Sequence, residues 1–326
     1  TQLKSFVLIF VLGTSAVTTS STEMNFYSFT ISNAQATVAP TLTSATYNAA
    51  TGVLAATAAG LTTGDTIAVS ALTLTGEGGA TQTLTTGNVT ASSSTAFSVT
   101  LNPADKAAVN LILNKNGTAS TGGTTFNLAG AANWDPTASA AADLTGNGIT
   151  VSNVAAPTIT SATYDATTGV LAVTGTGFLK RSGATNDIDV SKLTLSGDST
   201  AYTLTTASVE ITSGTAFSLT LGTTDKNALA LRLNKNGTAS LGAVTYNLAA
   251  AEDWAAGADA AVVVADLTGN AVTVSNAALP AVSSLSVAAG PLAGGTSVTL
   301  TGTNFTGATA VMFGANAGNG LSVTSA

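Results

Sequence analysis

Hydrophobic and polar residues alternate along most of this chain. The segments 72–75, 97–101 and 217–221 each place every second side chain on an apolar face, with hydroxyl residues between. A period of two is that of a half-buried strand, and the β-branched threonines suit its exposed face. Short clusters of Gly, Asn, Asp and Ser separate such segments, as in a β-sandwich. The pattern therefore predicts an all-β fold.

One segment in each half of the chain departs from this alternation. Asn102 is a good helix cap, Pro103 follows it at the first helical position, and Asp105 stands in the first turn. Residues 116–117, Asn-Gly, predict the end of this helix. A second copy covers 224–237, although its alternating leucines also fit a strand. We expect one short helix crossing between the sheets in each half.

The chain contains two copies of a similar sequence. Residues 40–153 and 157–276 share their landmarks, and the run Asn-Lys-Asn-Gly-Thr-Ala-Ser at 114–120 returns letter for letter at 234–240. Other landmarks recur as the pairs Pro40/Pro157, Tyr47/Tyr164, Gly52/Gly169, Gly60/Gly177 and Trp134/Trp254. The offset between the copies drifts by a few residues, as surface-loop insertions produce. The sequence therefore predicts two tandem modules of one fold.

The repeats divide the chain into four parts. We expect an N-terminal apolar strand or leader at 1–38, a first repeat at 39–154, a second at 155–277, and a partial third domain at 278–326. The triplet 151–153, Val-Ser-Asn, recurs at the second seam as 274–276, and Pro157 or Pro280 follows within a few residues. A proline at that place limits how far neighbouring modules swing.

The only continuous apolar run is residues 6–12, preceded by Lys4. It resembles the end of a signal peptide and fits a buried strand equally well. It is too short to span a bilayer, and no other segment is predicted to do so.

Composition narrows the function. Only 8% of the residues are charged and the net charge is −7, which argues against nucleic acid as a partner. The surface is left to Thr, Ser, Ala and Gly, so copies of the chain can pack together with little charge to desolvate. The chain has no Cys and no His, and so lacks disulfides and the usual general base near neutral pH. These features favour a non-enzymatic protein.

Two family resemblances follow from short motifs. The stretch 290–305, Gly-Pro to Asn-Phe, and Val-Met-Phe-Gly at 311–314 resemble the opening of an IPT/TIG domain. This resemblance implies a partial immunoglobulin-like sandwich at the C-terminus. The two main repeats look like the immunoglobulin-like repeats of large bacterial surface proteins, such as adhesins and surface-layer proteins. Their segments 143–147 and 266–270 are similar to the Asp-x-x-Gly-Asn turn before the last strand of such repeats.

Three acidic sites are calcium candidates, and no other cofactor is expected. Asp143 with Asn147, and Asp266 with Asn270, offer oxygen ligands near a module seam, and calcium takes six to eight oxygens. The alternative is a tight turn in which the Asp bonds its own backbone. Asp187 and Asp189 lie in an insertion, 180–189, that the first repeat lacks. They fit either a shared cation or a solvated loop tip.

Trp134 and Trp254 occupy equivalent places in the two repeats. Indole faces stack on sugars, but equivalence in both repeats favours a place in the core.

These features together predict a structural subunit of an extracellular, bacterial-type surface assembly, either a fibre or a surface layer. Its partners would be other copies of itself. Residues 3–12 of one copy would complete the C-terminal sandwich of the next by strand addition; the alternative is an ordered piece of a longer protein. The rival functions are a stalk or binding module of an adhesin, which contacts cell-surface glycans, and an accessory region of a carbohydrate-active enzyme.

Overall fold

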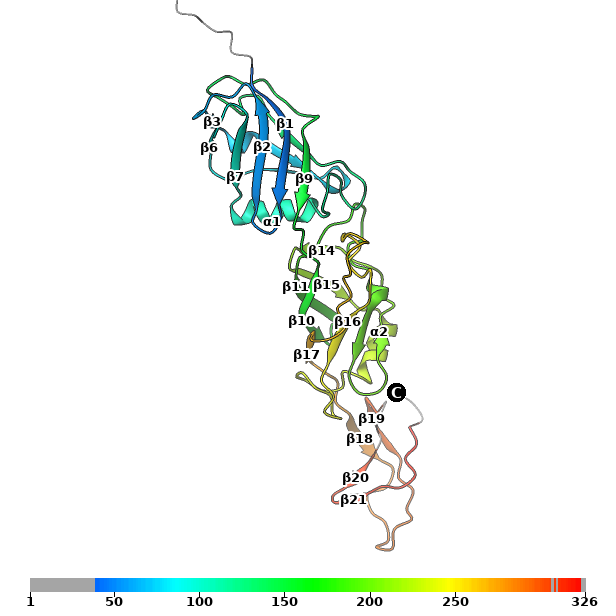
Figure 1. Ribbon diagram of the computed structural model, residues 1–326. Helices are drawn as coiled ribbons and strands as arrows, with labels where there is room; N and C mark the ends of the chain where they lie inside the picture. Colours follow the sequence, from blue (N-terminus) through cyan, green and yellow to red (C-terminus); the bar gives the residue numbers. More distant parts are fainter. Residues whose placement is uncertain (1–38, 306–307, 309, 324–326) are drawn as a thin grey trace, which may run out of the picture. The chain divides into compact units, whose positions relative to one another are not determined.

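The computed structural model describes residues 39–305, 308 and 310–323. The apolar run at 6–12, and with it the choice between leader and donor strand, lies outside the described residues. Within the described part, the predicted all-β fold is confirmed: the elements are mainly strands, with one short α-helix in each repeat (Figure 1). No helix among these residues is both long and apolar enough to cross a membrane.

The first repeat forms one curled mixed sheet with the strand order β5-β4-β8-β9-β1-β2-β7. Its first and last strands, β1 and β9, lie side by side and parallel, while β1 pairs with β2 antiparallel. A separate two-stranded ribbon joins β3 to β6. The elements are β1 (Thr41–Asn48), β2 (Val53–Ala59), β3 (Thr66–Ile67), β4 (Leu72–Thr75), β5 (Thr81–Thr83), β6 (Val89–Thr90), β7 (Ala96–Thr100), α1 (Pro103–Ile112), β8 (Asn127–Gly130) and β9 (Gly148–Ser152).

The second repeat has the same plan, with the order β13-β12-β16-β17-β10-β11-β15-β14. Here too the first and last strands, β10 and β17, are adjacent and parallel. The elements are β10 (Thr158–Asp165), β11 (Val170–Thr176), β12 (Leu193–Ser196), β13 (Tyr202–Thr203), β14 (Ile211–Ser213), β15 (Ala216–Thr220), α2 (Thr223–Ala230), β16 (Asn247–Ala250) and β17 (Ala271–Ser275).

Each sheet curls around its own set of buried side chains. The two sets run from Leu42 to Val151 and from Ile159 to Val274. Trp134 and Trp254 are fully buried, so the prediction of a core role for both indoles is confirmed. The domain boundaries at 38, 154 and 277 stay predictions.

The helices begin where the sequence predicts and end earlier. Asn102 caps α1 by accepting the N–H of Asp105, and Pro103 is its first residue. α1 ends at Ile112 rather than at 116–117, because the next turn leaves the helix and Asn114 turns its side chain to Glu77. The second copy is also a helix, α2, and ends at Ala230. Figure 1 shows α1 lying across the end of the sheet where β1 and β9 finish.

One buried aspartate joins each helix to the loop that follows an edge strand of its sheet, β5 or β13. Asp105 is 1% exposed and accepts the N–H and hydroxyl groups of Thr85 and Thr86 at 2.6–2.9 Å. Asp225 accepts the same four groups of Thr205 and Thr206. Burial alone raises the pKa of Asp105, but the bonds from Thr85 and Thr86 outweigh it and hold this pKa below its usual value.

The C-terminal segment begins with an antiparallel strand pair, as each repeat does, although its connection is longer. β18 (Ala281–Leu285) pairs with β19 (Leu300–Thr303), with a register shift at Val282/Ser284 like those in β1 and β10. A Cβ on Gly302 would collide with the ring of Phe305, as one on Gly175 would with Phe178. The last elements are β20 (Met312–Phe313) and β21 (Asn316–Ala317).

Replacing Asp105 tests how much the helix anchor contributes. Asp105→Ala leaves the N–H and hydroxyl groups of Thr85 and Thr86 without their common acceptor, so we expect the free energy of unfolding to fall by about 2 kcal/mol. Asp65→Ala is the control, because this half-exposed carboxylate accepts one turn N–H; it should cost at most about 1 kcal/mol. Urea denaturation measures both, and equal losses would contradict the anchor.

Candidate functional site: the junction between the repeats

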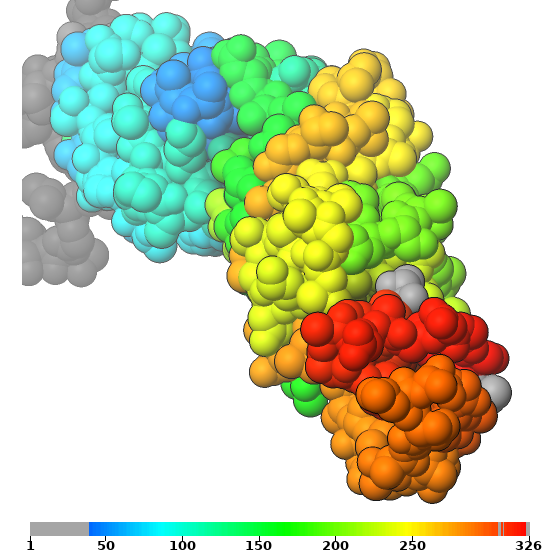
Figure 2. All heavy atoms as spheres, turned by 90° about the horizontal axis from the view of Figure 1, so that it is seen from below, coloured from blue at the N-terminus to red at the C-terminus, as the bar shows by residue number. Residues whose placement is uncertain are grey.

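The atoms of the two repeats adjoin one another in Figure 2. Hydrogen bonds between polar groups of both repeats make this contact. The first repeat contributes the β4–β5 turn, the end of α1 and the loop around Thr121. The second contributes its insertion, 180–189, and the loop around Gly257. Leu111 and Val154 pack against the buried side chains of both repeats.

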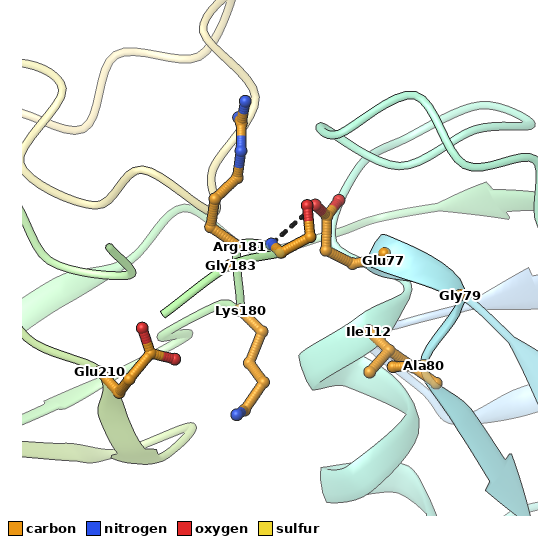
Figure 3. A pocket seen from close by; sticks show the side chains of 10 residues that line it. Glu77, Gly79, Ala80, Ile112, Lys180, Arg181, Gly183 and Glu210 are labelled. Atoms are coloured by element: carbon orange, nitrogen blue, oxygen red, sulfur yellow. Dashed lines mark hydrogen bonds between the residues drawn. The ribbon is translucent and has the colours of Figure 1, made fainter. Parts of the chain in front are cut away.

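Glu77 is the centre of this contact. Its side chain is 3% exposed, and one carboxylate oxygen, Oε2, accepts the Asn114 amide at 3.1 Å and the N–H of Gly122 at 2.8 Å. The other oxygen, Oε1, accepts the N–H of Ser182, in the second repeat, at 2.9 Å (Figure 3). One carboxylate therefore ties its own loop and the neighbouring repeat together.

Further bonds surround Glu77. Asn114 donates its amide to the carbonyl of Lys180 at 2.8 Å, and the N–H of Lys180 donates to Leu111 at 3.2 Å. The Thr121 hydroxyl donates to the carbonyl of Gly257 at 3.0 Å. An ion pair joins Lys115 to Asp259 at 3.3 Å. Most of these partners are backbone groups, so the junction fixes the path of the insertion rather than single side chains.

The sequence contains a signal for Glu77, because both repeats have an acidic residue at this turn. Its equivalent in the second repeat is Asp198, which accepts the Asn234 amide, the Ser240 hydroxyl and the Gly242 N–H, all within that repeat. An acid at the same turn in both copies marks the position. Glu77 is longer by one methylene, which lets its second oxygen reach Ser182.

The insertion is held from inside by Asp187. This side chain is fully buried and accepts the N–H groups of Arg181 at 2.6 Å and Ile211 at 3.0 Å. The interpretation of Asp187 as a solvated loop tip is therefore wrong: the loop folds back over its own carboxylate. Burial raises the pKa of Asp187, and the neighbouring Glu210 carboxylate raises it further.

Asp187 and Asp189 have different partners. Asp189 caps the turn at Val190–Lys192 by accepting the N–H of Ser191, at 3.1 Å. Among the described residues, no group of three or more Asp or Glu side chains gathers as a metal site would require. The calcium hypothesis for this pair stays a prediction.

Asp143 and Asn147 do come together, as do Asp266 and Asn270. The Asn147 amide donates to Asp143 Oδ1 at 3.0 Å, while Oδ2 accepts the N–H of Leu42 at 2.8 Å. Asp266 has the equivalent partners, Asn270 at 3.0 Å and Ile159 at 2.8 Å. Both carboxylates thus fasten the first strand of their repeat to the turn before the last strand. Calcium binding at these turns also stays a prediction.

A shallow cleft of about 330 Å³ lies beside the junction, lined by Glu77, Ile112, Lys180, Arg181 and Glu210 among others. Figure 3 shows Lys180 and Glu210 directed into the gap and Arg181 directed away from it. Both oxygens of Glu77 are occupied by donors, and Glu210 accepts the N–H of Asn186 at 2.8 Å. The carboxylates of this cleft hold backbone in place.

Comparison with known proteins adds one family. Residues 280–326 match the family model of the IPT/TIG domain, which confirms the resemblance drawn from 290–305 and 311–314. No curated protein matches the chain. The chain is thus an all-β protein with two sandwich-like repeats and an immunoglobulin-like IPT/TIG segment.

Acid should open the junction through Glu77. Burial alone raises the pKa of Glu77, but bonds from Gly122, Ser182, Ser120 and Asn114 outweigh it and lower the pKa from 4.5 to about 2. Because the folded pKa is depressed, the stabilisation is present above pH 4.5 and lost as the pH falls toward 2. We expect the Ser182 amide to lose protection from hydrogen exchange over this window, after correction for the intrinsic rate.

Two variants separate this effect from general acid unfolding. Glu77→Ala, which removes both acceptor oxygens, should show low protection at Ser182 at every pH. Asp198→Asn, at the equivalent position, should weaken only the second repeat's own turn and leave Ser182 protected at neutral pH. Full protection of Ser182 in Glu77→Ala would contradict the assignment.

Replacing Asp143 tests whether its turn has a structural role or binds calcium. Asp143→Ala frees the N–H of Leu42 and the Asn147 amide, so we expect a loss of about 2 kcal/mol in the free energy of unfolding. The measurement is denaturation of wild type and variant with calcium and with a chelator. A calcium-dependent gain in the wild type that the variant lacks would identify a metal site; an equal loss in both conditions would leave the turn structural.

Proposed function

We propose that this chain is a non-enzymatic structural subunit of an extracellular surface assembly of bacterial type, a fibre or a surface layer. The observation that carries the proposal is the junction around Glu77. Two repeats of one fold are fastened to each other by bonds to backbone groups, an arrangement suited to a building unit whose repeats act together. The IPT/TIG match at 280–326 adds a third immunoglobulin-like part to the same chain.

The exposed faces support self-association. On the paired strands β1 and β9, and on β10 and β17, the outward residues include Thr46, Thr150, Thr163 and Thr273. Hydroxyl groups are solvated without charge, so two copies that approach through these faces pay less desolvation than charged faces would. The chain's 8% of charged residues adds little repulsion between copies.

We further propose that copies polymerise by strand addition at the C-terminal segment. Large apolar side chains are exposed there: Val282, Leu285, Met312 and Phe313 are each 46–56% exposed. An apolar strand added to this segment would cover such side chains, and residues 3–12 have the sequence of an apolar strand.

Electron microscopy of the purified chain tests the assembly. We expect ordered fibres or sheets, and we expect them to be lost when residues 1–12 are deleted or when Val7 and Ile9 are both changed to Asp. Circular dichroism checks that these variants still fold. A chain that stays monomeric with and without calcium contradicts the proposal, and if such a monomer binds glycans it favours the adhesin function instead.

A further inference from the structure

The positions at which the chain enters and leaves each repeat determine the direction in which a pulling force acts on its strands. β1 and β9 are adjacent and parallel, in register from Ser44 opposite Gly148 to Asn48 opposite Ser152. Since the strands are parallel, the chain enters the repeat at one end of the pair and leaves it at the other, as Figure 1 shows for β1 and β9. Tension therefore pulls the two strands past each other along their axes.

Loading along the strand axes is the strong direction. The hydrogen bonds of a parallel pair are evenly spaced along it, so sliding one strand past the other strains all of them at once. If force acted across the pair at one end, the bonds would break one after another. The second repeat has the same geometry, with β10 and β17 in register from Ser161 opposite Ala271 to Asp165 opposite Ser275.

The entry strand is also held by a side chain from the exit side. Asp143, five residues before β9, accepts the N–H of Leu42 in β1 at 2.8 Å and is itself held by the Asn147 amide. In the second repeat, Asp266 accepts the N–H of Ile159 at 2.8 Å. These carboxylates extend the contact beyond the paired residues, toward the entry end.

The exit strand has a second support at its other end. Gly117 and Val151 exchange two backbone hydrogen bonds, of 2.9 and 2.7 Å, and Asn116 accepts the N–H of Val154 at 3.0 Å. The second repeat repeats this contact with bonds of 2.9, 2.8 and 2.7 Å. It uses Gly237 with Val274, and Asn236 with Ala277.

Three of the segments that the repeats share lie at this strand pair. The identical run 114–120 contacts the exit strand, and the Asp-x-x-Gly-Asn turn holds the entry strand. The triplet Val-Ser-Asn contains the last two residues of the exit strand and the residue that follows it. The insertion 180–189, in contrast, lies away from the pair, between β11 and β12.

From this geometry we infer that each repeat is a load-bearing module, in which the pairs β1–β9 and β10–β17 carry tension along the chain. The inference goes beyond the proposed function. Assembly concerns the partners of the chain, whereas load-bearing concerns the path of force within one molecule. A single-molecule measurement therefore tests it whether or not fibres form.

Single-molecule force spectroscopy on the full chain tests the inference by changing the direction of pull. The chain has no cysteine, so thiol handles attach only where they are introduced. Handles at Thr41→Cys and Ala155→Cys load the β1–β9 pair along its axis, and unfolding should release chain on the order of 40 nm, at about 3.6 Å per residue. Handles at Thr51→Cys and Ala155→Cys lie at one end of the pair and peel it open.

We expect the axial pull to require a force several times that of the peeling pull at equal loading rate, since the rate of forced unfolding is set by the barrier along the pulling direction. Equal forces in the two directions would overturn the inference.

Side-chain variants test the clamp itself. In the axial geometry, Asn116→Ala should lower the unfolding force. Thr73→Ala should not, because it removes only the hydroxyl pair with Thr83 at the far edge of the sheet. The reverse order of effects would also overturn the inference. Urea denaturation of both variants shows whether a force difference exceeds their difference in equilibrium stability.

Discussion

The structure depends on carboxylates that accept backbone N–H groups. Asp105 and Asp225 anchor the helices, Asp143 and Asp266 hold the first strands, and Glu77 joins the repeats. A buried carboxylate is costly unless donors surround it, and several donors at short distance make it a strong local tie. A chain with 16 acidic residues and no cysteine thus uses some of its few charges as internal fasteners.

The same interaction links the fold to the proposed function. At Glu77 the carboxylate bonds to its own loop and to Ser182, so the stability of one repeat and its contact with the next share a side chain. At Asp143 the carboxylate connects the entry strand to the exit side. Hydrogen bonds of this kind couple a displacement of one repeat to the next, which suits the proposed role in a surface assembly.

Some of the fold could be predicted residue by residue. The alternation at 72–75 and 97–101 gave the strands β4 and β7, and Asn102-Pro103 gave the start of α1, because period and capping are local properties. The burial of Trp134 and Trp254 followed from their equivalence in the two repeats. The IPT/TIG segment was evident from its motifs. The end of α1 was predicted too late, at 116–117 instead of Ile112, because the side chain of Asn114 turns to Glu77, 37 residues away.

The sequence by itself determined the strand type, the repeat and the choice of residues for turns and caps, because each rests on neighbours within a few positions. Only the tertiary structure decided what the acids do. The interpretation of Asp187 as a solvated loop tip was wrong, because this carboxylate accepts the N–H of Ile211. The role of Glu77 could not be predicted, because it depends on the N–H of Ser182 in the other repeat. The tertiary structure also decided that entry and exit strands lie parallel, since strand order depends on packing between segments about 100 residues apart.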